Sequence, residues 1–298
     1  MKVTAGLCLT GILVLSGTSM AAVGATEASS NARIADAIAS APRSSEVVTS
    51  SPGATVAAND GSSVTLPSEP ASDIAFLSPD GIPASLSLPD ATPRYTQALE
   101  GGSARAIVVI DNASRPDSYA FDLALPEGIE PKLQPNGSVS FVPSAAVAER
   151  IASQGIHATF DFGGLETPWA IDADGASVET HYTLDGNTVV QHVDLASTSS
   201  FPVIADPEME WKGYYATLTY SKSETLGMRD QGVIIAGMLV AAAGMAAFGP
   251  PGAAIGAVMV GIGAASVGII AATASNAVGD GRCLSLDVPS MMPSIVNC

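Results

Sequence analysis

Two histidines and a glutamate lie close together in one segment, and their side chains are the ones best suited to chemistry. The segment reads SVETHYTLDGNTVVQHVDL and contains Glu179, His181 and His192. Imidazole nitrogens and a carboxylate oxygen are ligands that proteins offer to Zn²⁺. Whether these three side chains can share an ion depends on the register of the hairpin that holds them.

The Asp185-Gly186 pair predicts a tight β-hairpin turn of type I′, because both central positions of that turn need positive φ. A two-residue turn at this pair places Leu184 opposite Asn187. His181 and His192 then lie diagonally across the polar face, about 7–8 Å apart, which is long for a shared ion. The sequence therefore predicts a solvated sheet face and no metal site. The opposite face is predicted to be buried and carries Val178, Tyr182, Val189 and Val193.

The other motifs that could carry chemistry are incomplete. Asp172-x-Asp174-Gly175 begins like a calcium-binding loop, but His181 occupies the position where such loops place a bidentate glutamate. This segment is predicted to be a plain turn. The motifs G-x-S-x-G, H-E-x-x-H, S-x-x-K and a phosphate-binding glycine loop do not occur in the sequence. We therefore expect no catalytic residue, no cofactor and no enzymatic activity.

Composition and charge exclude one class of partner. Acidic residues outnumber basic residues 29 to 12, the formal net charge is -17, and no cluster of Lys and Arg occurs. Because nucleic-acid binding depends on such clusters to contact phosphates, nucleic acid is not an expected partner. Charged residues make up only 14 % of the chain, against about 25 % in typical soluble domains.

The first 25 residues have the pattern of a secretory signal peptide. Met1-Lys2 gives a short positive start, and Ala5 to Leu15 is an apolar run too short to span a bilayer. Val23-Gly24-Ala25 is a small-x-small cleavage site, so residues 1–25 are predicted to be removed after Ala25. The mature protein is expected to be exported, either to the cell envelope or to the extracellular space.

Two further segments follow the predicted leader. Residues 26–60 are rich in Ala, Ser and Thr and are predicted to be a flexible spacer, with a short helix at 33–40. Residues 61–220 are predicted to be an antiparallel, β-sandwich-like domain. Within it, Tyr119 to Leu125 alternates large apolar residues with small or polar ones, which is typical of a half-buried strand.

Residues 221–279 are predicted to form an apolar, Gly- and Ala-rich helical hairpin. Ser221-Lys222-Ser223-Glu224 matches a capping box, from which one helix is expected to run into a charge-free stretch that begins near Gly232. The Gly249-Pro250-Pro251-Gly252 segment must end this first arm, and a second arm covers about 253–272. The predicted fold class is thus mainly β, an antiparallel sandwich-like domain, with a C-terminal α-helical hairpin.

Small residues recur at four-residue spacing in the second arm, a pattern that lets helices approach closely. The predicted helix-packing positions are Gly252, Gly256, Gly261 and Gly268. Residues 280–298 are predicted to be a short tail closed by a disulfide between Cys283 and Cys298. The only other cysteine, Cys8, would be lost with the leader, and an even pair in an oxidising compartment favours a bridge.

Four sequence elements in the middle of the chain resemble a group of exported actinobacterial proteins of uncharacterised function. The elements are PWAIDADG, VETHYTL, GNTVVQHV and PVIADP, at residues 168–175, 178–184, 186–193 and 202–207. The resemblance implies export and a β-rich body, and it transfers no catalytic residue.

Three functions remain open from the sequence. We expect the first, in which the hairpin tethers an exported, non-enzymatic envelope protein to membrane lipid and also offers a surface for homo-oligomer formation. In the second, the hairpin packs on itself in a secreted soluble protein that inserts into or perforates membranes, as bacteriocin-like peptides do. In the third, an extracellular binding module uses the polar face of the sheet.

Overall fold

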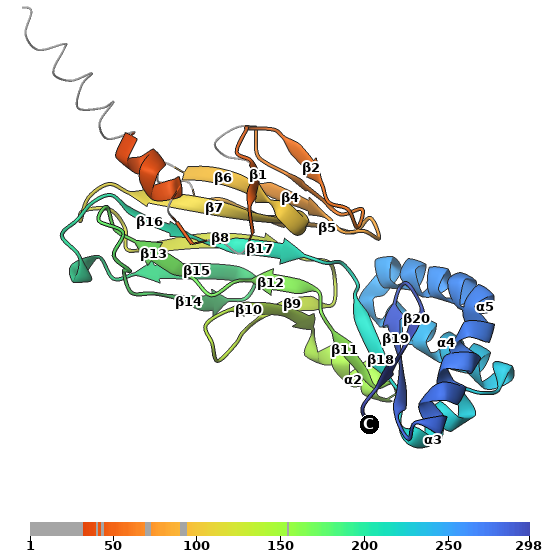
Figure 1. Ribbon diagram of the computed structural model, residues 1–298. Coiled ribbons are helices and arrows are strands. Elements are labelled where there is room, and N and C mark those ends of the chain that lie inside the picture. The colour runs from red at the N-terminus through yellow and green to blue at the C-terminus, as the bar shows by residue number, and fades with distance from the viewer. Residues whose placement is uncertain (1–31, 40, 43–44, 69–72, 90–93, 154) are drawn as a thin grey trace, which may run out of the picture.

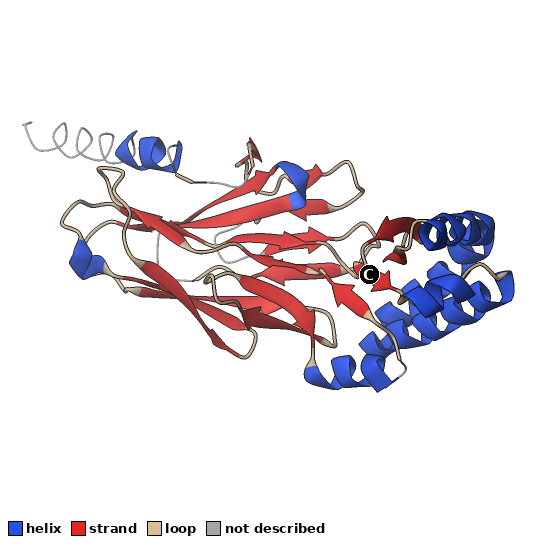
Figure 2. Ribbon diagram, turned by 60° about the horizontal axis from the view of Figure 1, so that its bottom comes forward, coloured by secondary structure: helices blue, strands red, loops and turns tan. Residues whose placement is uncertain are grey.

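Three antiparallel β-sheets and a C-terminal helical hairpin make up most of the described part of the chain. The computed structural model describes residues 32–39, 41–42, 45–68, 73–89, 94–153 and 155–298. The predicted leader, with its cleavage site at Ala25, lies outside the described residues. The two larger sheets lie face to face along the long axis of the molecule, and the helical hairpin lies at one end (Figure 1, Figure 2). The predicted fold class, a mainly β protein with a C-terminal helical hairpin, is confirmed.

The first sheet has nine strands. Most of them pair side by side in a single series, and two lie outside that series. The series runs β1 (Val47–Thr49), β6 (Arg94–Leu99), β7 (Ser103–Ile110), β17 (Glu208–Trp211), β12 (Gly163–Leu165), β10 (Val139–Pro143) and β9 (Ile129–Leu133). Outside this series, β16 (Val203–Asp206) pairs with β7 and with β13 (Trp169–Ile171).

The second sheet has seven strands. Their order is β14 (Thr180–Asp185), β15 (Thr188–Val193), β8 (Ser118–Ala124), β5 (Pro83–Leu86), β4 (Ile74–Leu77), β3 (Ser63–Thr65) and β2 (Thr55–Ala57). Strand β8 alternates exposed and buried residues along its whole length, which confirms the half-buried strand predicted there. The buried side chains, such as Phe121 and Leu123, meet those of the first sheet in one continuous core.

The first sheet is covered on both faces at β7, whose eight residues are all buried. A helix at 32–39 covers the outer face, where Ile34 and Ala37 pack against Ile107 and Val109. This helix agrees with the short helix predicted at 33–40. Strands β1 and β2 also lie within the segment expected to be a flexible spacer. Each pairs with a sheet strand, so most of the described part of 26–60 belongs to the fold.

A buried arginine attaches the N-terminal segment to the first sheet. The Arg105 side chain is fully buried, and its Nε donates to Gln97 Oε1 at 2.7 Å. Its Nη1 donates to the carbonyl of Pro42 at 2.7 Å, and its Nη2 donates to that of Ile38 at 3.4 Å. The guanidinium also lies over the Trp169 ring, 5.7 Å from the ring centroid. A buried arginine is stable only with such partners, so the segment that follows the helix at 32–39 is part of the core arrangement.

The third sheet has four strands and joins the sandwich to the end of the chain. Its order is β11 (Ala158–Phe160), β18 (Ala216–Thr219), β19 (Cys283–Val288) and β20 (Met292–Val296). The predicted Cys283–Cys298 disulfide is present, with its Cα atoms 5.1 Å apart. The tail is therefore more than a closed loop, because β19 and β20 form a hairpin that extends a sheet begun by β11 and β18.

The helices follow the predicted order with one interruption that the sequence did not suggest. Besides the helix at 32–39, the described helices are α2 (Ala145–Ser153), α3 (Lys222–Gly227), α4 (Gln231–Met245) and α5 (Gly249–Gly279), with short 3₁₀ turns η1 (Glu100–Gly102), η2 (Leu195–Ser197) and η3 (Ala246–Phe248). Ser221 and Glu224 form the predicted capping box of α3. The expected continuous helix is wrong, because Asp230 starts a new helix by accepting hydrogen bonds from the backbone N–H groups of Gly232 and Val233.

Candidate functional site

The C-terminal helical hairpin, formed by α4, η3 and α5, packs on the rest of the protein along one stripe of side chains. In α4, Ile234, Met238, Ala241 and Met245 are buried. Their spacing of three or four residues places them on one side of the helix. In α5, Ile255, Met259, Ile270 and Ala274 are buried in the same core as Leu284 and Leu286 of the third sheet. The hairpin is thus held against that sheet by part of its surface.

Glycines bring the two arms of the hairpin together. A Cβ atom at Gly252 would lie 2.1 Å from the carbonyl oxygen of Met245, and one at Gly256 would lie 2.6 Å from that of Ala242. These two predicted packing positions therefore lie against the backbone of the first arm. The α5 start agrees with the predicted break, since prolines are tolerated at the first helical positions.

The other two predicted packing glycines differ from expectation. A Cβ atom at Gly261 or Gly268 would meet no atom of the described residues within 4 Å, so neither glycine makes a close helix contact there. Gly263, which the four-residue spacing missed, lies against the Met238 side chain, where a Cβ would be 2.2 Å from its sulfur. A repeat of small residues does not show which side of the helix faces its partner, and only the arrangement of α4 and α5 decides it.

The rest of the hairpin surface is apolar and exposed. Among the described residues, eight of the thirteen exposed large hydrophobic side chains lie between Leu226 and Met292. Six of them define the surface that we call the hairpin face: Val233, Ile235, Leu239 and Val240 of α4, and Val258 and Ile269 of α5, each between 45 % and 63 % exposed. No charged side chain occurs from Gly232 to Ala277. Helices α4 and α5 pack against each other, and exposed apolar side chains on such a pair of helices are typical of contact with a protein or a membrane.

Length limits how the hairpin can meet a bilayer. By length and apolar composition alone, the stretch Gln231–Gly261 is long enough to cross a membrane, and 39 % of its most apolar window is buried in the protein. The chain reverses within this stretch, at η3. Helix α4 has 15 residues and is therefore about 22 Å long, against about 30 Å for the hydrocarbon core of a bilayer. In this conformation the first arm does not reach across.

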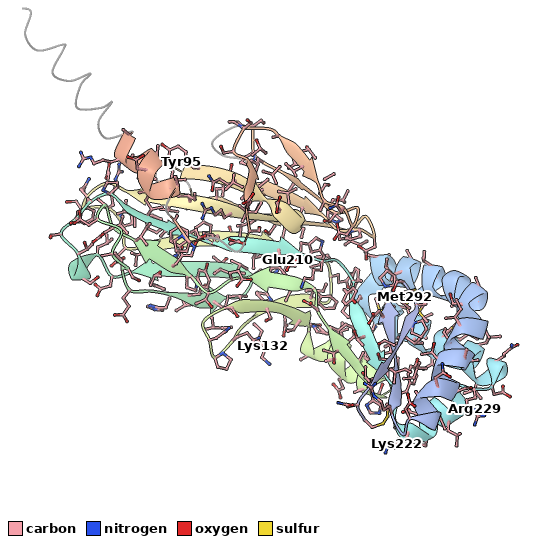
Figure 3. The ribbon with its side chains drawn as sticks, in the orientation of Figure 1. Tyr95, Lys132, Glu210, Lys222, Arg229 and Met292 are labelled. Carbon is pink, nitrogen blue, oxygen red and sulfur yellow. A yellow bond between two sulfur atoms is a disulfide. The ribbon has the colours of Figure 1, made fainter. Side chains whose placement is uncertain are left out.

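Charge is distributed unevenly between the hairpin end and the rest of the chain. Residues 222–298 contain the carboxylates Glu224, Asp230, Asp280 and Asp287 and the cations Lys222, Arg229 and Arg282. Nearly all of the net charge of -17 therefore belongs to residues before 222. Lys222 and Arg229 lie at the α3 end of the hairpin (Figure 3). An almost neutral end is compatible with approach to a lipid surface, whereas the acidic sandwich is not drawn to anionic lipid.

The histidines of β14 and β15 are closer than predicted, because the register differs. Strands β14 and β15 pair Asp185 with Thr188, so the turn residues are Gly186 and Asn187 and not Asp185 and Gly186. Gly186 has a φ of 58° at the first central position, which is where a type II′ turn places glycine. A shift of two residues keeps the same side chains on the buried face, and Val178, Tyr182, Val189 and Val193 are all buried there as predicted.

In the actual register, His181 lies directly opposite His192 and not diagonal to it. The two imidazole rings stack, with centroids 4.9 Å apart and planes inclined by 15°. Thr183 Oγ1 lies 2.9 Å from His192 Nε2. Among the described residues, no group of three or more His, Cys, Asp or Glu side chains is arranged to hold a metal ion.

The segment that begins like a calcium loop is a turn whose carboxylate is already saturated. Asp172 Oδ1 accepts hydrogen bonds from the backbone N–H groups of Asp174 at 3.0 Å and Ala176 at 2.9 Å, and Oδ2 accepts one from Thr198 Oγ1 at 2.8 Å. Burial acts to raise the pKa of Asp172, but these hydrogen bonds lower it below its ordinary value. The carboxylate therefore holds the turn in shape.

A cleft of about 570 Å³ lies where the sandwich meets the third sheet. Its polar lining includes Asp80, Asp161, Glu210, Lys212 and Tyr215. Lys212 Nζ lies 2.8 Å from Asp161 Oδ2 and 3.3 Å from Glu210 Oε2, which joins these three side chains in one ion-pair cluster. Burial raises the pKa of Glu210 above its ordinary value. The described residues that line the cleft include neither histidine nor cysteine.

Sequence reasoning missed the buried polar residues between the two large sheets. Asp206 and Gln191 are almost fully buried, and each has one side-chain oxygen without a hydrogen-bond partner among the described residues. The strands that hold these residues look half-exposed in the sequence, so only knowledge of their burial could have identified the two residues.

A search of protein-family models, curated proteins and solved structures found no match to this chain.

Proposed function

We propose that this protein is an exported, non-enzymatic envelope protein that attaches to a membrane surface through the apolar face of its C-terminal helical hairpin. The observation that carries the proposal is the hairpin face, whose large side chains are roughly half exposed on helices without charge. Removing such side chains from water is favourable by about 25 cal/mol per Å². The leader predicted at residues 1–25 supports export.

The geometry favours a hairpin that lies in the membrane interface. The stripe of buried side chains on α4 and α5 is already occupied by the third sheet, whereas the hairpin face is free for lipid. A hairpin docked in this way keeps its contacts with the sheet and its disulfide outside the bilayer. Burial of an apolar helix face at the interface is a common mode of peripheral attachment.

Co-flotation with phosphatidylcholine vesicles tests the attachment. We expect the protein to float with the vesicles at low and at high salt, because the contact is apolar and salt screens only charge interactions. Recovery of the protein in the bottom fraction at every lipid concentration would contradict the proposal.

A second candidate is perforation of a target membrane. It is favoured by the length of α5, whose 31 residues correspond to about 46 Å of helix and exceed the thickness of a bilayer core. Crossing would require α5 to leave the third sheet. Release of a trapped dye from vesicles that bind the protein distinguishes the two: attachment at the interface leaves the dye inside, and perforation releases it.

A further inference from the structure

The histidine pair on the β14–β15 hairpin lies outside the hairpin face and has no part in attachment to lipid. We propose that His181 and His192 form a binding site for a transition-metal ion of the class that prefers imidazole, namely Zn²⁺, Ni²⁺ or Cu²⁺. Imidazole nitrogens bind these ions well, whereas Mg²⁺ and Ca²⁺ prefer oxygen ligands. The proposal is independent of the membrane attachment.

The register of the β14–β15 hairpin makes His181 and His192 suitable for chelating an ion. His181 and His192 are cross-strand partners, for which Cβ atoms are about 4.5–5.5 Å apart. An ion at about 2.0–2.1 Å from each of two nitrogens needs those nitrogens within about 4 Å of each other. The ring centroids are 4.9 Å apart, and His181 is exposed. Because it is exposed, the His181 side chain is free to turn about its Cα–Cβ and Cβ–Cγ bonds, out of the stacked arrangement, and so direct one nitrogen toward an ion shared with His192.

Thr183 prepares one of the two ligands. Its hydroxyl lies 2.9 Å from His192 Nε2. When Nε2 carries the proton and donates it to Thr183 Oγ1, Nδ1 of the same ring presents its lone pair to the ion. Histidines that bind metals commonly have their second nitrogen held by such a hydrogen bond, which orients the ring and selects the tautomer. Thr183 is thus a positioning residue for the site.

Two nearby carboxylates attract a cation electrostatically but do not serve as further ligands beside the two imidazoles. Glu179 and Asp194 are the next pair along the hairpin on the same face, and Asp194 N–H donates to the Glu179 carbonyl at 2.9 Å. Two residues along a strand correspond to about 7 Å, so both carboxylates attract a cation without sharing the imidazole site. Within the described chain no third ligand joins the histidines. Water would fill the remaining positions of a bound ion and leave them exchangeable.

Isothermal titration of the untagged protein with Ni²⁺, Zn²⁺ and Cu²⁺ tests the site. We expect His181→Ala and His192→Ala each to weaken binding at least tenfold, because either change leaves a single imidazole. Thr183→Val should weaken it about tenfold, within the range for loss of such an orienting hydrogen bond. His157 is the only other histidine in the chain, so His157→Ala is the matched control and should bind as the unaltered protein does.

A second readout separates loss of ligands from loss of fold. Bound Cu²⁺ should show nitrogen hyperfine structure from two imidazoles in electron paramagnetic resonance, and His181→Ala should reduce it to one. Far-UV circular dichroism of the same samples should be unchanged, because His181 is exposed. Equal affinity in the protein and in both histidine variants would overturn the proposal, and so would loss of binding in His157→Ala alone.

Discussion

Removal of two exposed side chains from the hairpin face should weaken membrane attachment by a predictable amount. Leu239 is 55 % exposed and Ile269 is 63 % exposed. Truncation to alanine removes three carbon atoms from each, worth about 0.8 kcal/mol per carbon when fully transferred from water. Scaled by the exposed fractions, the losses are about 1.3 kcal/mol for Leu239→Ala and about 1.5 kcal/mol for Ile269→Ala. Together they correspond to about a hundredfold weaker partitioning.

The assay is the fraction of protein that co-sediments with phosphatidylcholine vesicles as the lipid concentration is raised. The half-binding concentration should rise about tenfold in each single variant and about a hundredfold in the double variant. Leu133→Ala is the matched control, because this leucine is 42 % exposed on β9, outside the hairpin. The control should partition as the unaltered protein does. By the same scaling, the buried fractions of the two side chains limit the change in the free energy of unfolding to about 1 kcal/mol for each substitution.

Two results would refute this reasoning. If the double variant partitions as strongly as the unaltered protein while remaining folded, the hairpin face does not contact lipid. If Leu133→Ala weakens partitioning as much as the hairpin variants do, the attachment is a general property of exposed apolar residues. Sedimentation equilibrium without lipid adds one more comparison. A dimer that dissociates in the double variant would identify a second copy of the chain as the occupant of this face.

Three further predictions concern stability, and urea unfolding measures each of them. Gly256→Ala should destabilise the protein by about 1–3 kcal/mol, because the new Cβ would lie 2.6 Å from the Ala242 carbonyl oxygen. Its control, Gly261→Ala, meets open space and should stabilise the helix by up to about 1 kcal/mol. Equal effects of the two substitutions would contradict the packing of the two arms. Cys298→Ser opens a disulfide with a sequence separation of 15 residues and should cost about 3 kcal/mol, a loss that reductant should reproduce in the unaltered protein only. Burial raises the pKa of Asp206 well above its ordinary value of 3.8. The folded state therefore binds this proton more tightly than the unfolded state, so the free energy of unfolding should fall as pH rises above about 3.8. Asp206→Asn should flatten that pH dependence.

The sequence by itself determined the order and type of most elements. Period-two alternation identified β8, and the Ser221 to Glu224 capping box and the double proline marked the starts of α3 and α5. Two cysteines after the hairpin were enough to predict the disulfide. These features depend on the chemistry of a few adjacent residues, namely side-chain periodicity, cap hydrogen bonds and the fixed φ of proline, so the sequence carries them directly.

The register predicted for the β14–β15 hairpin was wrong because two similar turns compete. Asp185-Gly186 and Gly186-Asn187 are both acceptable hairpin turns, of type I′ and type II′. The two registers differ by two residues, so they bury the same face and the hydrophobic pattern cannot separate them. The choice decided whether His181 faces His192, and therefore whether the hairpin offers a pair of ligands.

Tertiary structure alone decided which surfaces are covered. The charge-free tract is nearly uniform in sequence, and a repeat of small residues gives no direction around the helix. The third sheet buries one stripe of it and leaves the hairpin face exposed, so Gly256 is a contact and Gly261 is not. The helix at 32–39 likewise buries the outer face of β7, where Arg105 bonds to the carbonyls of Ile38 and Pro42. These contacts join segments that are far apart in the chain, so no local sequence pattern predicts them.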